Sequence, residues 1–356
     1  MLRNLNLKVL FCLFFLVFPP TPFVIEIQAE EDIPVGISEE SKLRFAAWNL
    51  QFLGHNNPIN AKIKGKDEFK TIARILNKYD FIAIIELMPD DVKNEKSSDG
   101  KIELEDNADL KKILKKLRKN HGRKFKYLIS PQVGWKGGSY QEHYAFLYDE
   151  KINVVPEGEK GNTNGSLYHL PVERPEDRME VTDKFSRPPF WATFRAGNFD
   201  FTVIAVHLYY GPQKPNEKRK RSIAERRNEI RELAKVYNKV QDMDEQENDV
   251  LLVGDFNMPP SDISFADLKN KAHKVTPLFH IKNGDVSNLA KTPMLYDNIF
   301  FQQKHLNEYL DSCIDKFHLT YFGGNKKAAR MVSDHLPVWA EFRIDLEDDD
   351  PEGNSQ

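Results

Sequence analysis

A short apolar run followed at once by polar residues constrains the fold of this chain more than any other stretch. Residues 250–253 are all apolar, which is typical of a strand buried on both faces. Gly254 ends the run, and the prolines at 259–260 prevent its continuation. Asp255 and Asn257 stand between those limits, where polar side chains add little stability. A turn closed by the Asp255 side chain and a functional site fit this pattern about equally well.

Other predicted strands also end on polar residues, and this recurrence favours a functional site. The residues and their predicted strands are Asn49 near the end of 43–50, Glu86 after 81–85, His207 after 199–206, Asp297 within 294–301, and Asp334 with His335 before 338–342. Glu142 stands near the start of a further alternating strand, 140–148. A single histidine after an apolar strand is more often a hydrogen-bonded core residue than a catalyst. Several such positions in one chain favour function, because ionised groups are rarely buried without a partner or a metal ion.

Helical patterns separate some of these strands. Apolar residues have helical spacing in residues 69–76, 110–117 and 215–240. The glycine and asparagine at 197–198 predict a hairpin turn before the strand that ends on His207. Strands that alternate with helices early and pair in hairpins later are typical of mixed sheets covered by helices. No internal repeat or linker divides residues 43–344, which we interpret as one domain.

The two ends of the chain differ from this region. Residues 1–29 combine Arg3 and Lys8 with an apolar run that is short for a membrane span, a pattern typical of an export signal. Residues 30–42 predict a flexible lead-in, and residues 345–356 an acidic, disordered tail. Removal of the signal leaves Cys313 as the one cysteine, so no intramolecular disulfide can form. We therefore expect a secreted or periplasmic monomer with no stable membrane association.

Two basic segments stand out against a formal net charge of −3 over 356 residues. The helix at 110–119 carries lysines and arginines on its polar face, which we interpret as a solvated surface. The segment 214–227 carries seven basic residues against two glutamates, and it follows His207 closely. Overall charge neither requires nor excludes a nucleic-acid partner, because local patches matter more. The position of the second segment predicts a basic rim beside any site that contains His207.

The polar strand ends supply carboxylates, amides and two histidines. The sequence holds no Gly-x-Ser-x-Gly elbow, no P-loop and no Cys/His zinc spacing. Carboxylate and amide oxygens suit a hard divalent ion such as Mg²⁺, with Ca²⁺ or Mn²⁺ as alternatives. Histidines beside carboxylates suit proton transfer. Together these groups predict metal-assisted hydrolysis of a phosphoester, in which water attacks phosphorus in line with the leaving oxygen.

Eight short motifs contain these residues and occur in a fixed order along the chain. They are Trp48-Asn49-Leu50-Gln51-Phe52-Leu53-Gly54, Ile85-Glu86, Tyr140-x-Glu142, Ser186-Arg187-x-Pro189, Val206-His207, Gly254-Asp255-Phe256-Asn257, Tyr296-Asp297 and Ser333-Asp334-His335-x-Pro337. Their order resembles the endonuclease/exonuclease/phosphatase superfamily, and specifically its deoxyribonuclease I-like branch. The match extends from Leu43 to about Phe342. The resemblance implies an α/β fold, a four-layer α/β/β/α sandwich of two mixed sheets packed face to face with helices outside.

The resemblance also implies a role for each strand-end residue. Glu86 would hold the metal ion, with Asn49 and Asp334 nearby, and the pairs His207–Glu142 and His335–Asp297 would act as general acid and base. Asp255 and Asn257 would bind the phosphate or the attacking water. Arg187 and Tyr140 would contact the scissile or neighbouring phosphates. Either histidine can be the acid and the other the base. The implied activity is that of an exported, Mg²⁺-dependent endonuclease that hydrolyses the phosphodiester bonds of DNA with little sequence preference.

Other activities occur in the same superfamily, which includes sphingomyelinases, inositol-polyphosphate phosphatases and abasic-site nucleases. The main alternative is a phosphodiesterase or phosphatase that acts on lipid headgroups or phosphorylated small molecules. A lipid enzyme would expose an apolar hairpin, for which Tyr209-Tyr210 is a weak candidate. A catalytically inactive binding module would show losses among the eight motifs, and the proposed metal and proton-transfer positions show none.

Two motifs distinguish the branches. Tyr140-x-Glu142 and Ser186-Arg187-x-Pro189 favour the deoxyribonuclease I-like branch. Met88 stands where this branch usually has an arginine that would reach the DNA minor groove. We therefore do not expect that minor-groove contact in this protein.

Overall fold

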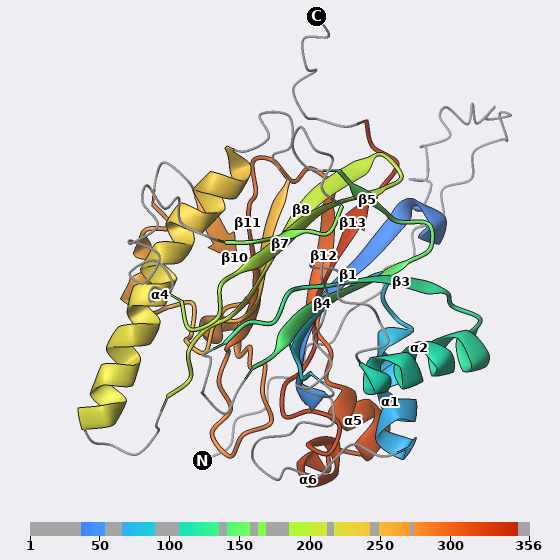
Figure 1. Ribbon diagram of the computed structural model, residues 1–356, viewed down its shortest axis with the longest axis horizontal. Helices are drawn as coiled ribbons and strands as arrows, with labels where there is room; N and C mark the ends of the chain where they lie inside the picture. The colour runs from blue at the N-terminus through green and yellow to red at the C-terminus, as the bar shows by residue number, and fades with distance from the viewer. Residues whose placement is uncertain are drawn as a thin grey trace, which may run out of the picture. The chain divides into compact units, whose positions relative to one another are not determined.

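A computed structural model describes residues 37–53, 66–89, 107–134, 141–156, 163–168, 185–211, 217–242, 249–270 and 274–347 (Figure 1). The described residues from Ser38 onward belong to one compact unit. The predicted export signal, most of the lead-in, the tail beyond Glu347 and Tyr140 lie outside the described residues.

Two mixed sheets form the centre of the protein. The first sheet contains β1 (Lys42–Leu53), β2 (Phe81–Leu87), β3 (Phe125–Ile129), β4 (His143–Asp149), β12 (Tyr309–Ile314) and β13 (Val338–Arg343), in the order β12-β13-β1-β2-β4-β3. The second contains β5 (Asn153–Val155), β6 (Ser166–Leu167), β7 (Phe190–Ala196), β8 (Phe199–His207), β9 (Val250–Asp255), β10 (Val275–Pro277) and β11 (Asp297–Gln302), in the order β10-β11-β9-β8-β7-β5, with β6 paired to β7. One neighbouring pair in each sheet is parallel, β1 with β2 and β8 with β9.

Helices cover the outer faces of the two sheets (Figure 1). The helices are α1 (Lys66–Leu76), α2 (Ala108–His121), α4 (Glu217–Gln241), α5 (Phe317–Phe322) and α6 (Lys326–Ala329), with short 3-10 turns η1 (Glu39–Ser41), η4 (Ile263–Ala266) and η5 (Ile281–Asn283). Phe45 and Phe81 of the first sheet contact Phe201 of the second, with ring centroids 6.2 and 5.5 Å apart. A second buried cluster joins Leu233 of α4 to Leu252 of β9. These contacts confirm the expected sandwich of two sheets between helices.

The register of the second sheet brings three site residues side by side. His207 at the end of β8 pairs with Asp255 at the end of β9, and Asp255 pairs in turn with Asp297 at the start of β11. Gly254 permits this close pairing, because it has a φ of +130° and a Cβ there would lie 2.1 Å from the Val206 carbonyl oxygen. The glycine that ends the apolar run is therefore a requirement of the backbone.

The structure contains the predicted strands and all three predicted helices, and the hairpin at 197–198 joins β7 to β8. The sequence analysis missed β10 and β12, and the residues of β12 alternate poorly. It also missed β5 and β6, which pair with β7. Lys42 belongs to β1, one residue before the predicted domain start. Within the described residues, no helix is both long and apolar enough to cross a membrane.

Candidate active site

The carboxyl ends of strands from both sheets meet at one place. Asn49 of β1 and Glu86 of β2 come from the first sheet, and His207 and Asp255 come from the second. The Asn49 side chain joins the sheets, because its Nδ2 donates to Glu86 Oε1 at 2.8 Å and to Asp255 Oδ2 at 3.1 Å. Residues far apart in the sequence therefore converge because each sheet contributes its parallel strand pair.

Glu86 is held by unusual backbone geometry. It adopts a left-handed conformation with a φ of 63°, as does Phe52 with a φ of 54°. The N–H of Phe52 donates to Glu86 Oε2 at 3.0 Å, and the N–H of Gln51 donates to Asn49 Oδ1 at 2.9 Å. Non-glycine residues with positive φ are strained and concentrate at functional sites. The left-handed residues Phe52 and Glu86 therefore lie where the two side chains are hydrogen-bonded to the backbone.

The first histidine is held by a buried carboxylate and an arginine. His207 Nδ1 lies 2.6 Å from Glu142 Oε1, and Arg187 Nε lies 3.3 Å from the other oxygen of Glu142. Arg187 Nη1 also donates to the His207 carbonyl oxygen at 3.2 Å. Burial opposes ionisation of Glu142, but Arg187 and His207 hold its pKa below the usual value. Burial and Arg187 act against the charged imidazole, yet Glu142 and Glu86 raise the pKa of His207.

The second histidine has a similar arrangement on the other side. His335 Nδ1 lies 2.7 Å from Asp297 Oδ2, which also accepts a hydrogen bond from Ser287 Oγ at 2.7 Å. Trp48 Nε1 donates to the His335 carbonyl oxygen at 2.9 Å. Burial raises the pKa of Asp297. Burial also acts against the charged form of His335, but Asp297 and Asp255 raise its pKa well above the usual value.

Both histidines direct their free ring nitrogen at one carboxylate. His207 Nε2 and His335 Nε2 each lie 3.8 Å from Asp255 Oδ2. In each ring the Nδ1 atom is already hydrogen-bonded to a carboxylate, which leaves Nε2 for proton transfer. Two proton-transfer groups thus face the same point from different strands.

The loop after β9 completes this arrangement. Asn257 has a φ of 50°, its N–H donates to Asp255 Oδ1 at 2.8 Å, and its Nδ2 donates to the Leu208 carbonyl oxygen at 2.8 Å. Arg226 of α4 donates to the Asn257 carbonyl oxygen, and its guanidinium lies 5.8 Å from the Tyr210 ring centroid. The turn that the Asp255 side chain closes is therefore part of the candidate site itself.

Several known proteins similar to this chain are deoxyribonucleases. The deoxyribonuclease of Thioalkalivibrio sp. (strain K90mix) is 29% identical over 311 residues, which cover 84% of this chain and 71% of that protein. Human deoxyribonuclease gamma is 26% identical over 315 residues, which cover 85% and 86% of the two chains. No family model matches the sequence.

A solved structure shares the fold. The endonuclease/exonuclease/phosphatase protein from Bacteroides vulgatus is 14% identical, with a TM-score of 0.52 over 85% of this chain and 99% of that chain. This is an endonuclease/exonuclease/phosphatase fold. The resemblance to the deoxyribonuclease I-like branch is confirmed, because the similar curated proteins are deoxyribonucleases.

Acidic and histidine side chains of this site could hold a metal ion. Two groups of side chains among the described residues lie close enough together to hold a metal ion, Glu86 with His207 and Asp255, and Asp255 with Asp297 and His335. Burial raises the pKa of Glu86 despite the opposing effect of His207. A cation would stabilise the ionised carboxylate. The Asn49 amide nitrogen donates a hydrogen bond to each of Glu86 and Asp255, so the two carboxylates share one donor.

The structure places most of the predicted site residues in this cluster. The pairs His207–Glu142 and His335–Asp297 are hydrogen-bonded, whereas their roles as acid and base stay predictions. Asp334 belongs to neither metal-binding group, and its Oδ1 lies 3.9 Å from His335 Nε2.

The two residues predicted to contact phosphate are placed less directly. Arg187 is mostly buried against Glu142, so it acts on the histidine pair, and its contact with a phosphate stays a prediction. Tyr140 lies outside the described residues.

Sequence reasoning missed the residues that orient the site. Ser287 orients Asp297, and no apolar strand precedes it to mark its position. Glu229 of α4 is buried and accepts hydrogen bonds from the N–H groups of Ser186, at 2.5 Å, and Tyr209, at 2.7 Å. It therefore joins the loop that carries Arg187 to the loop that follows His207. Both act through tertiary contacts that span many residues, so local spacing contained no signal for them.

Proposed function

We propose that the protein is an exported, Mg²⁺-dependent endonuclease that hydrolyses the phosphodiester bonds of DNA with little sequence preference. The observation that carries the proposal is the convergence of His207 Nε2 and His335 Nε2 on Asp255 Oδ2, each at 3.8 Å. The similarity to deoxyribonucleases supports DNA as the substrate. The basic and then apolar pattern of residues 1–29 supports export.

The two histidine pairs suit the two proton transfers of phosphodiester hydrolysis. One Nε2 removes the proton of the attacking water, and the other delivers a proton to the leaving oxygen. Glu142 and Asp297 each hold an imidazole by its Nδ1 atom, so the tautomer and the direction of each Nε2 are fixed. Asp255 and Asn257 orient the phosphate or the water between the two rings. Either histidine fits either role.

A divalent ion would bind at Glu86, with Asn49 and Asp255 beside it. When bound, such an ion neutralises negative charge that develops on the phosphate oxygens. Carboxylate and amide oxygens favour Mg²⁺ or Ca²⁺ over softer ions. The protein itself supplies orientation and proton transfer, through side chains that are already hydrogen-bonded in place.

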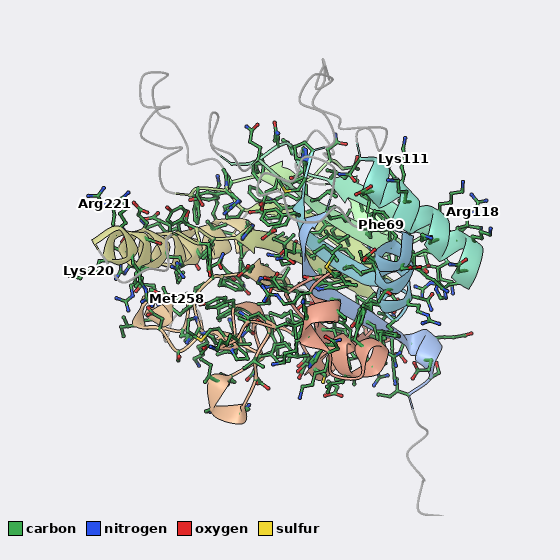
Figure 2. All side chains as sticks on the ribbon, turned by 90° about the horizontal axis from the view of Figure 1, so that it is seen from below. Phe69, Lys111, Arg118, Lys220, Arg221 and Met258 are labelled. Atoms are coloured by element: carbon green, nitrogen blue, oxygen red, sulfur yellow. The ribbon has the colours of Figure 1, made fainter. Side chains whose placement is uncertain are left out.

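Basic residues at the start of α4 support a polyanionic substrate. We call Lys218, Arg219, Lys220 and Arg221 the α4 patch, and all four are exposed. Figure 2 shows Lys220 and Arg221 at one end of α4, on the same side of the protein as Met258, which follows Asn257. Contacts from such residues to phosphates hold DNA without reading its sequence. A local positive field of this kind attracts DNA to a protein of net negative charge.

Incubation with a panel of substrates tests the proposal. Purified protein lacking residues 1–29 is mixed with plasmid, RNA, sphingomyelin and inositol phosphates, with Mg²⁺ or with EDTA. We expect plasmid cleavage with Mg²⁺ and none with EDTA. Turnover of sphingomyelin or inositol phosphates without plasmid cleavage would contradict the proposal in favour of a lipid or small-molecule phosphoesterase. When the full-length chain is produced in cells, recovery of the protein from the medium or the periplasm would support export, and retention in the cytoplasm would contradict it.

A further inference from the structure

An open pocket lined mainly by cations lies on a part of the surface that the proposed mechanism does not use. Its volume is about 390 Å³, and it is lined by Leu289, Ala290, Lys291, Lys326, Lys327 and Arg330. Four of these six side chains are cationic and none is acidic. The pocket is formed by α6 on one side and by the loop before β11 on the other.

Several contacts place this pocket beside the catalytic centre. The N–H of Leu289 donates to the Asp334 carbonyl oxygen at 2.7 Å, and Asn288 forms a β-bridge with His335. On the opposite wall of the pocket, Arg330 Nη2 lies 3.9 Å from Asp334 Oδ2. Both walls of the pocket are therefore attached to the segment that carries the His335 imidazole.

Carboxylates of the described residues neutralise little of the positive charge of the pocket. Among the described residues, none of the three lysines forms an ion pair with a carboxylate, and all three are exposed. The pairing of Arg330 with Asp334 is long, at 3.9 Å. Like charges gathered in one hollow repel one another and attract an anion. The walls offer no aromatic ring for stacking a base, since Leu289 and Ala290 are the only apolar lining residues.

We propose that this pocket binds a backbone phosphate of the DNA strand next to the phosphate that is cleaved. The proposal builds on the proposed nuclease function and adds a second anion site to it. Lysine ammonium groups bind phosphate as point charges, and three of them can adapt to one or two phosphate groups. Such a contact fixes the register of the strand over His335 and carries no sequence information. DNA would then be held on both sides of the acidic centre, by the α4 patch and by this pocket.

The test measures DNA binding without cleavage. Lys291, Lys326 and Lys327 are replaced together by alanine in a His335→Ala background, so that the DNA stays intact while Mg²⁺ is present. The affinity for a labelled duplex is measured by fluorescence anisotropy over a range of salt concentrations. A plot of the logarithm of the association constant against the logarithm of the salt concentration has a negative slope. The magnitude of this slope should decrease by about one for each phosphate that the variant no longer binds, and the dissociation constant should rise. The triple arginine variant keeps the charge and should keep the slope.

A matched control removes the same charge elsewhere. Lys111, Lys115 and Arg118 lie on α2, and Figure 2 shows Lys111 and Arg118 pointing away from the body of the protein. Their triple alanine variant should bind DNA with the parent slope. An unchanged slope in the pocket variant, or an equal fall in the α2 variant, would overturn the pocket assignment. Failure of the unaltered protein to cleave DNA would instead overturn the proposed function, and the phosphate site with it.

Discussion

The candidate active site and the α4 patch hold their side chains in different ways. We call the centre of the site, with His207, His335 and Asp255, the floor. In the floor, His207 and Asp255 are only 5% and 1% exposed, and short hydrogen bonds fix each group. In the α4 patch, all four side chains are exposed on the helix surface. Buried, fixed groups favour one geometry, whereas exposed long side chains adapt to many positions of a ligand.

This difference separates chemistry from substrate capture. A fixed floor lowers the barrier for any phosphodiester that reaches it, so its loss should reduce kcat on large and small substrates alike. The adaptable, positively charged α4 patch attracts a polyanion. Its loss should therefore raise KM for DNA and weaken the dependence of DNA binding on salt. Each substitution below tests which of the two behaviours a residue shows.

The largest effect is expected for the histidines of the floor. His207→Ala and His335→Ala should each reduce turnover by roughly 10²–10⁴-fold, because each removes a proton-transfer group. Initial rates on plasmid and on a nitrophenyl phosphodiester measure the reduction, and near-UV circular dichroism checks the fold. His121→Ala, at the end of α2, is the matched control and should behave like the parent protein. A parent-like rate in either site variant would show that its histidine does not transfer a proton.

The next effect concerns the metal site. Glu86→Gln keeps the shape of the side chain and removes one negative charge, so the Mg²⁺ concentration needed for half activity should rise. The rise in Tm that Mg²⁺ causes should also shrink, because weaker binding stabilises the folded state less. Both titrations are made on the same preparation. Curves that overlay those of the parent protein would exclude Glu86 as a ligand.

A substitution of Arg226 tests whether this residue acts with the floor or with the α4 patch. It belongs to the basic segment by sequence, yet it is only 4% exposed and donates to the Asn257 carbonyl oxygen. Arg226→Ala should therefore behave like a floor variant, with kcat reduced roughly 10–100-fold on both substrates. Arg227→Ala is the matched control, because Arg227 pairs with Asp262, 2.8 Å away, and should leave kcat near the parent value. A change in KM for DNA with no change in kcat would show that Arg226 acts in DNA binding, like the α4 patch.

The smallest effect on chemistry is expected for the α4 patch. Replacement of its four residues by alanine should raise KM for duplex DNA and reduce the salt slope by about 0.9 for each phosphate that the patch no longer neutralises. The nitrophenyl ester is too small to reach the patch and should be hydrolysed at the parent rate. Four α2 substitutions, of Lys111, Lys115, Lys116 and Arg118, are the control. Equal reductions on both substrates would indicate damage to the fold.

The structure brings together residues that the sequence singled out because they border buried strands, whereas their roles stay predictions. Asp255, His207 and Glu86 each follow an apolar run, and the strand register alone then brings Asp255 beside His207 and Asp297. The alternation of strands and helices predicted mixed sheets covered by helices, and the resemblance to the superfamily implied the four layers. Local pattern was sufficient wherever the secondary structure itself positions the side chain.

Tertiary contacts limited the rest of the prediction. The basic segment was treated as one surface, but the structure buries Arg226 and pairs Arg227 with Asp262, which leaves the α4 patch as the exposed part. The support that Ser287 gives to Asp297 depends on a loop folding back across the sheet edge. The cationic pocket joins two segments that are far apart in sequence. Spacing along the chain does not report contacts of this kind.

One comparison of substrates tests the central claim most directly. The protein is given supercoiled plasmid and a nitrophenyl phosphodiester, each with Mg²⁺ or EDTA and over a range of salt. The account predicts that both are hydrolysed with Mg²⁺, that EDTA stops both, and that added salt slows plasmid cleavage much more than ester hydrolysis. Hydrolysis of the ester with no cleavage of plasmid at any salt concentration, or cleavage that persists in EDTA, would contradict it.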